Sequence, residues 1–129
     1  MYDFKQFYIN GHWVDPVAPR EFGVVNPATE TVVGTISMGS PADVDKAVAA
    51  ASAAFESFGR TSRQERIELL EAILAEYKKR KEEVALAICD EMGAPMSLAR
   101  DAQAGSGDQH IGGALEALKT MPWLMMPYL

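Results

Sequence analysis

Residues 31–55, TVVGTISMGSPADVDKAVAAASAAF, change from a strand-like to a helix-like pattern at Ser40. The β-branched run before that point is typical of a strand. Ser40, Pro41 and Asp43 then supply a capping residue, a proline at the first helical position and an acid near the positive helix end. The sequence therefore predicts strands before residue 40 and helices after it. The apolar face expected for the first helix consists of Val44, Ala47, Val48, Ala51 and Phe55.

Two β-hairpins are predicted before this point. Asn10 and Gly11 favour a two-residue type I′ turn, because both residue types tolerate the positive φ that this turn requires. The turn residues NPATE at 26–30 predict the second hairpin. Two hairpins alone are marginally stable in water, so we expect them to pack against other elements. The four expected strands are Phe7–Ile9, His12–Val14, Phe22–Val25 and Thr31–Ile36.

A long second helix is expected to begin at a capping box formed by Ser62–Glu65. We expect a break or bend near Arg80, and a stop at Gly93 and Pro95 because neither residue continues a helix readily. The apolar positions expected along this helix are Ile67, Leu70, Leu74, Tyr77, Val84, Leu86 and Ile88.

A third helix is expected from Ser97 to Leu118, across a segment at 105–113 that is poor in helix formers. Its residues GSGDQH, at 105–110, superficially resemble a phosphate-binding loop. A dinucleotide fingerprint follows a strand, whereas this segment follows a helical pattern. We interpret it as a helix interruption or a close-packing site.

Length and charge limit the classes of protein to which this sequence belongs. The chain has 129 residues, of which 48% are hydrophobic, and a formal charge of −6. A chain of this size buries about two-thirds of its unfolded surface, which excludes a disordered tail. The acidic balance excludes binding to nucleic acid or an anionic membrane through overall charge. No apolar run approaches the ~18 residues of a membrane-spanning helix, so we expect no membrane partner.

Few residues are candidates for catalysis. Cys89 is the single cysteine, so it forms no internal disulfide, and a cytoplasmic location is expected. It lies in a helical pattern before two acids that disfavour the thiolate, so we interpret it as a core residue. His12 and His110 have no partner at the spacing of a zinc site. The alternative is a small enzyme that uses Cys89 or His110.

Two further segments stand out by composition. The basic run Lys78–Lys81 precedes two glutamates, and we expect a solvated helix face with i,i+4 pairs from Glu76 to Arg80 and from Lys78 to Glu82. Residues 121–129, MPWLMMPYL, are nearly all apolar. A chain seldom ends on an uncovered apolar segment, because exposed apolar patches promote association. We therefore expect that this chain ends before its core is complete.

Several stretches, in the family's order, resemble the N-terminal region of the NAD(P)-dependent aldehyde dehydrogenases. FYINGHWV at 7–14 is similar to the opening hairpin, and VVNPATE at 24–30 is similar to the turn that follows. DVDKAVAAA at 43–51 is similar to the first helix. Arg66–Leu70 and EMGAP at 91–95 are similar to the long second helix and its stop, although most members have Lys where this chain has Ala94. The resemblance extends over about residues 7–120.

This resemblance implies an α/β fold with a Rossmann-type cofactor domain. Residues 1–129 would be an incomplete N-terminal segment of that domain, with two β-hairpins, about three α-helices and no second domain. NAD or NADP would be the cofactor of the full-length protein, with none expected to bind this chain alone. The catalytic cysteine, the general-base glutamate, the oxyanion asparagine and the cofactor glycine motif would all lie beyond residue 129.

The resemblance also implies one site and two kinds of partner. Some members hold a monovalent cation near the surface, and the matching ligands here would be Val24, Val25 and Glu91. Backbone carbonyls and a carboxylate suit a hard cation. The expected partner is the remainder of the dehydrogenase polypeptide or a second copy of the chain, and the full-length family forms dimers or tetramers. The alternative is a stand-alone helical module that binds a partner without catalysis.

Overall fold

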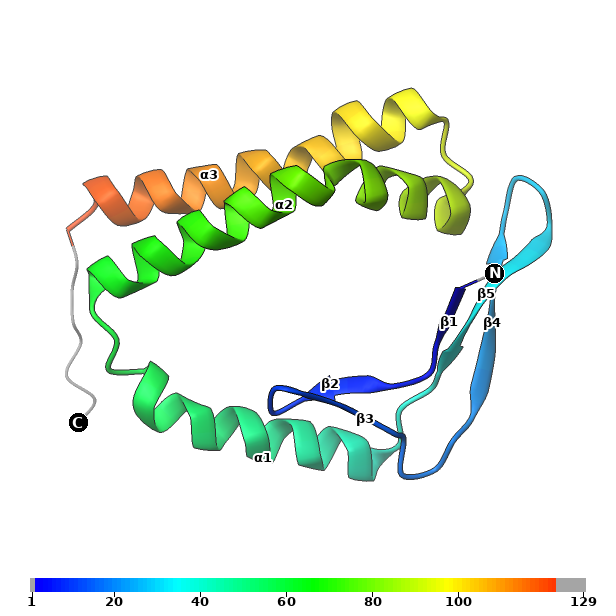
Figure 1. The fold of residues 1–129 in the computed structure, drawn as a ribbon, viewed down its shortest axis with the longest axis horizontal. Helices are drawn as coiled ribbons and strands as arrows, with labels where there is room; N and C mark the ends of the chain where they lie inside the picture. Colours follow the sequence, from blue (N-terminus) through cyan, green and yellow to red (C-terminus); the bar gives the residue numbers. More distant parts are fainter. Residues whose placement is uncertain (1, 123–129) are drawn as a thin grey trace. The chain divides into compact units, whose positions relative to one another are not determined.

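The computed structural model describes residues 2–122. Its elements follow the predicted order, with short strands first and helices after them (Figure 1). They form two compact units, which are described separately. The first unit contains the residues up to Arg60 together with Asp90–Gly93, and the second contains Thr61–Cys89 and the residues from Ala94 onward.

Both predicted hairpins are present in the first unit. Strands β2 (Phe7–Ile9) and β3 (His12–Val14) pair antiparallel across Asn10 and Gly11, whose φ angles of 53° and 79° fit the predicted turn. Strands β4 (Glu21–Asn26) and β5 (Thr31–Ser37) form the second hairpin.

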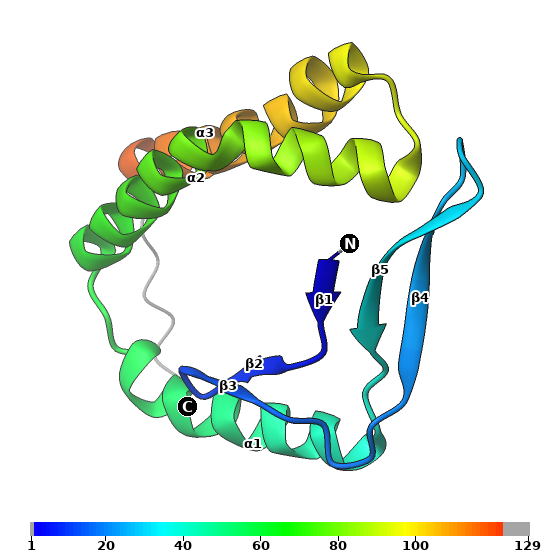
Figure 2. The ribbon, with the colours of Figure 1, turned by 45° about the vertical axis from the view of Figure 1, so that its right-hand side comes forward.

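One strand was not predicted. Strand β1 (Tyr2–Phe4) pairs parallel with β5 and completes a three-stranded sheet in the order β1-β5-β4 (Figure 2). Its three residues are too few for an alternating pattern, and its partner lies about thirty residues further along the chain.

Helix α1 (Pro41–Phe58) begins where the capping pattern places it. The Asp43 carboxylate accepts hydrogen bonds from the Ser40 amide and hydroxyl, at 2.8 and 2.7 Å, and from the Val17 amide at 2.9 Å. The same carboxylate therefore starts the helix and holds the chain segment between β3 and β4. The apolar side chains predicted on one face of α1 are largely exposed, as Val44 and Val48 at 57% and Phe55 at 54% show.

Helix α2 (Arg63–Met92) begins at the predicted capping box, in which Glu65 accepts hydrogen bonds from the Ser62 amide and hydroxyl. Helix α2 continues through Arg80 without a break, because the Lys, Arg and Glu residues around it are good helix formers and pair along the helix surface. The alternative expectation, a bend, agrees with the curved course of α2 in Figures 1 and 2. Leu86, predicted on the apolar stripe, is exposed. The buried or half-buried face contains Ile67, Leu70, Leu74, Tyr77, Lys81, Val84, Ala85 and Ile88.

The predicted third helix is present in a modified form. A π-helical segment, η1 (Leu98–Gln103), leads into α3 (Ala104–Thr120), and the helix continues through the glycines without the expected interruption. Ala85, Ala99 and Ala104 form the buried centre of this unit. No large side chain is fully buried in the part of the chain that the structure describes. Among the same residues, no helix is both long and apolar enough to cross a membrane.

The predicted end of the chain is only partly described. Met121 follows α3 and is exposed, and the apolar residues 123–129 lie outside the described part of the chain.

Candidate functional site

Two of the three residues matched to a cation site lie together in the first unit. Val24 on β4 and Glu91 near the end of α2 line a small hollow of about 20 Å³ beside β1 and β5. A space of this size holds about one water molecule or one small ion. Val25, the third predicted residue, is half exposed and does not line the hollow.

The backbone at Val24 and Val25 departs from a regular ladder. Val24 pairs with Gly34 and Val25 pairs with Val32, so that β5 has one additional residue at this point. Such a bulge bends the local backbone and interrupts the pairing of the strands. The irregularity lies where the family resemblance places the carbonyl ligands.

Two motifs far apart in sequence meet in this unit. Asn26 Oδ1 accepts hydrogen bonds from the amides of Ala28 and Thr29, at 2.8 and 3.2 Å, and fixes the turn between β4 and β5. Gly93 has a φ of +64°, and a Cβ built on it would lie 2.9 Å from Ala28 Cβ and from the Ala28 amide nitrogen. The NPATE turn and the end of α2 therefore approach each other at Gly93, two residues beyond Glu91.

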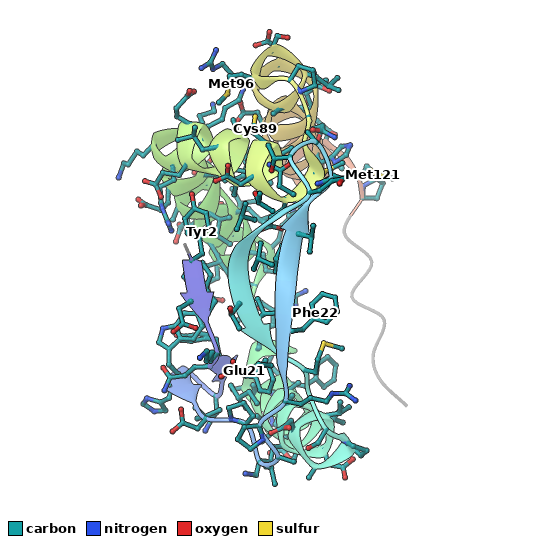
Figure 3. All side chains as sticks on the ribbon, turned by 90° about the vertical axis from the view of Figure 1, so that its right-hand side faces the viewer. Tyr2, Glu21, Phe22, Cys89, Met96 and Met121 are labelled. Carbon is teal, nitrogen blue, oxygen red and sulfur yellow. The ribbon has the colours of Figure 1, made fainter. Side chains whose placement is uncertain are left out.

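Tyr2 joins the N-terminal strand to the same end of α2. Its hydroxyl donates a hydrogen bond of 3.0 Å to Asp90 Oδ2. This hydrogen bond, together with the negative charge of Asp90, raises the pKa of Tyr2. Figure 3 shows Tyr2 at the start of β1. The contact ties β1 to the short segment that contains Glu91.

The hollow offers few ligands. Glu91 is the only carboxylate among its lining residues, and the remaining oxygen donors of that lining are backbone carbonyls and the Tyr2 and Thr35 hydroxyls. Within residues 2–122, no group of three or more His, Cys, Asp or Glu side chains could hold a metal ion. This donor set fits a hard monovalent cation better than a transition metal.

Cys89 packs within the second unit. It is half-buried beside the Ala85, Ala99 and Ala104 cluster, and its Sγ lies 3.9 Å from Met96 Sδ (Figure 3). This surrounding agrees with a structural role. His12 and His110, the other catalytic candidates, are both exposed.

The basic run does not form the predicted i,i+4 pairs. Arg80 pairs with Glu83 at 2.9 Å, and Glu82 is bound instead by Arg100 of η1. Lys81 is half-buried and pairs with Asp108 of α3 at 2.8 Å. Three of the four basic residues remain on a solvated face, while Lys81 joins α2 to α3.

The glycine segment is a close-packing site, as predicted, and lies within α3. A Cβ on Gly107 would lie 2.4 Å from the ring of Tyr77. The Tyr77 hydroxyl also donates a hydrogen bond of 2.8 Å to the Ala104 carbonyl. The segment therefore lets α2 and α3 approach closely and does not form a phosphate-binding loop.

Comparison with known proteins gives one consistent result. The sequence model of the aldehyde dehydrogenase family matches residues 13–124. A 3-succinoylsemialdehyde-pyridine dehydrogenase from a Pseudomonas species is 46% identical over 120 residues, which are 92% of this chain and 25% of that protein. The chain therefore spans about a quarter of the length of this relative.

Solved structures have the same fold. An aldehyde dehydrogenase from Bartonella henselae superimposes with a TM-score of 0.93 at 40% identity, over 99% of this chain and 27% of that one. A mutant of aldehyde dehydrogenase C from Pseudomonas syringae, complexed with NAD+ and octanal, gives a TM-score of 0.90 at 44% identity, over 95% of this chain and 25% of that one.

Proposed function

The chain belongs to the aldehyde dehydrogenase family, and on that premise we propose that it forms the N-terminal part of the cofactor-binding domain of an NAD(P)-dependent aldehyde dehydrogenase. The whole protein would oxidise an aldehyde to a carboxylic acid. In such an enzyme a cysteine thiolate attacks the aldehyde, and hydride passes to the nicotinamide cofactor. The contribution of this chain is structural, and the catalytic groups belong to the remaining polypeptide.

The incomplete core of the described residues supports this proposal. None of their large side chains is fully buried, while Phe4, Phe22, Val44, Val48 and Phe55 are all more than half exposed. Soluble domains of this length usually bury several large apolar side chains in a core. Further polypeptide that covers these side chains would complete the core.

The hollow at Glu91 is proposed as part of a monovalent cation site. From the lining of the hollow, Glu91 would supply a carboxylate and Val24 a backbone carbonyl. The carbonyl of Val25, which lies outside that lining, and groups from the remaining polypeptide would supply further ligands. The irregular pairing of β4 with β5 lies opposite these two valines, and the additional residue, Val33 of β5, also lines the hollow. The whole protein is proposed to be a cytoplasmic homo-oligomer.

The proposal is tested with two pieces of protein. The chain alone should produce no NADH or NADPH from an aldehyde, and Cys89→Ser should leave that result unchanged. Co-expression with the remainder of the P. syringae enzyme should give NADH formation from octanal that neither piece gives alone. Activity of the isolated chain that Cys89→Ser abolishes would contradict the proposal.

The rival interpretation is a stand-alone helical interaction module. The comparisons do not favour it, because the aldehyde dehydrogenase family model matches residues 13–124 and the similar proteins found are dehydrogenases. The two differ in the co-expression experiment, because an independent module would not restore dehydrogenase activity to the remainder of the P. syringae enzyme.

A further inference from the structure

We propose that Tyr2 is a positioning residue for the proposed cation site, because its hydroxyl holds Asp90 and thereby places Glu91 at the hollow. The inference rests on the proposed function and deepens it by adding the N-terminal strand to the site. The family model matches residues 13–124, so that match assigns no role to Tyr2.

The Glu91 carboxylate is not held directly. Among the hydrogen bonds and ion pairs of residues 2–122, none involves this carboxylate, although Glu91 lines the hollow. Its position is therefore set by its neighbours in the chain. Asp90 directly before it accepts the hydrogen bond from Tyr2, and Gly93 two residues after it packs against Ala28. Glu91 thus lies between two points at which the end of α2 is attached to the first unit.

The Tyr2 ring has a restricted orientation. Phe4 lies on the same face of β1, and the two rings stack with their centroids 6.0 Å apart and their planes at 13°. Both residues line the hollow. Because stacked aromatic rings prefer a defined geometry, Phe4 limits the directions in which Tyr2 presents its hydroxyl to Asp90.

Gly34 allows Tyr2 to lie beside the hollow. The two residues are paired in the parallel ladder of β1 and β5. A Cβ added at Gly34 would lie 3.2 Å from the Tyr2 carbonyl oxygen and 3.3 Å from Tyr2 Cβ, and Gly34 itself is buried and lines the hollow. The close approach of β1 to β5 therefore depends on the absence of a side chain at residue 34.

The Tyr2 hydroxyl lies near both carboxylates at the end of α2. The hydrogen bond to Asp90 is the main cause of the raised pKa of Tyr2, and the negative charge of Glu91 adds to it. A direct contact between the Tyr2 oxygen and the cation is the other role that this location allows. The experiment below distinguishes the two roles, because only the positioning role requires Asp90.

The test uses one polypeptide in which residues 1–120 replace the matching segment of the B. henselae enzyme, since that enzyme superimposes on 99% of this chain. Its Tm is measured over a titration with NaCl and, separately, with KCl, while tetramethylammonium chloride keeps the ionic strength constant. The ion concentration that gives half of the maximal rise in Tm reports binding to the folded protein. Glu91→Ala, which removes the proposed carboxylate ligand, should abolish the rise.

Two variants interrupt the positioning contact from its two sides. Tyr2→Phe removes only the hydroxyl, and Asp90→Ala removes its acceptor. Each should raise the half-maximal ion concentration about tenfold, as the loss of a group that orients a metal ligand does. The double variant should raise it no further, because both changes act through one hydrogen bond. Asp90→Asn keeps an oxygen that accepts this hydrogen bond and should remain close to the parent.

Tyr8→Phe is the matched control. It is the same chemical change at an exposed tyrosine of β2 that does not line the hollow, and it should leave the half-maximal concentration unchanged. A hydrogen bond with a merely structural role would lower Tm equally with and without the ion. In that case Tyr2→Phe would keep the half-maximal concentration of the parent, and the proposal would be overturned.

The remaining outcomes separate this inference from the cation site itself. A folded Tyr2→Phe that responds to the ion like the parent, while Glu91→Ala does not respond, would overturn the positioning role and leave the site intact. A loss in Tyr2→Phe without a loss in Asp90→Ala would make Tyr2 a direct ligand instead. A folded parent without any response to Na+ or K+ would overturn the site and this inference together.

Circular dichroism and size-exclusion chromatography show which variants fold. If the fused protein does not fold, the same titrations are made on the chain co-expressed with the remainder of the B. henselae enzyme.

Discussion

Asp43 joins the start of α1 to the chain segment between β3 and β4. The Ser40 hydroxyl, the Ser40 amide and the Val17 amide all donate to its carboxylate, and these hydrogen bonds lower the pKa of Asp43. Because the pKa is lower in the folded state than in the unfolded state, the ionised carboxylate stabilises the fold. This stabilisation is complete above the unfolded-state pKa of about 4, and it is lost as the pH falls through the folded-state pKa.

We predict that Asp43→Asn lowers the free energy of unfolding at pH 7, and that the difference from wild type shrinks as the pH falls below about 4. Urea unfolding at pH 7 and pH 3 measures both quantities. Asp45→Asn, at an exposed position on the same helix, should change neither. A difference between Asp43→Asn and wild type that is constant with pH would contradict this account.

Ser40→Ala should lower the free energy of unfolding by about 1 kcal/mol, as the loss of an N-cap usually does.

Gly93 combines a left-handed backbone with close packing. Its φ is +64°, a backbone conformation that residues with a side chain rarely adopt. A Cβ added at Gly93 would also lie 2.9 Å from Ala28, so any side chain at this position is strained twice. Gly93→Ala should therefore destabilise the chain by more than about 1 kcal/mol. Thermal unfolding measures the effect. Gly39→Ala is the control, since its Cβ would meet only Phe7 Cζ, at 3.8 Å. Equal shifts in Tm for both variants would show that the close approach of Gly93 to Ala28 is absent.

At the scale of elements, α2 has one face that packs and one that does not. Ile67 is 7% exposed and Ile73 is 45% exposed on the same helix. Ile67→Ala should cost about 2–5 kcal/mol, as truncation of a buried aliphatic side chain does, and Ile73→Ala should cost less than about 1 kcal/mol. Chemical denaturation provides the comparison, and equal costs would show that the packed face is assigned wrongly.

The contact of α2 with α3 depends on Gly107. Gly107→Ala should lower stability, because the new Cβ collides with the side chain of Tyr77, whose hydroxyl donates a hydrogen bond to the Ala104 carbonyl. Gly112→Ala, in the same helix with nothing within 4 Å of its Cβ, should instead raise stability by about 0.5–1 kcal/mol. Tm values of the two variants that move in the same direction would contradict this arrangement.

Local chemistry made most of these elements predictable. Asn10 and Gly11 specify a turn, and the Ser40 and Ser62 caps specify helix starts, because each signal acts within a few residues. Strand β1 and the pairing of Lys81 with Asp108 depend on partners far along the chain, which no local pattern reveals. The cation site residues came from the family resemblance alone. The sequence marks Gly93 as the end of a helix, but it does not reveal that this glycine packs against the NPATE turn.

At the scale of the whole molecule, the exposed apolar surface should control solution behaviour. Apolar side chains on α1 and on the strands of the first unit, among them Val44, Val48 and Phe22, are exposed. We predict that the isolated chain self-associates or aggregates, with the formal charge of −6 opposing this only modestly. Light scattering over a dilution series tests the prediction. A concentration-independent monomer with sharp cooperative unfolding would instead favour a complete module.

The central claim is that this chain is an interchangeable structural part of an aldehyde dehydrogenase. The most direct measurement uses a single polypeptide in which residues 13–120 replace the matching segment of the P. syringae enzyme, which is 44% identical to this chain. Under the proposed function, in which the catalytic groups belong to the remaining polypeptide, the fused protein should fold and form NADH from octanal and NAD+ at a rate similar to that of its unmutated parent. A fused protein that folds and assembles like its parent, yet forms no NADH, would contradict the claim.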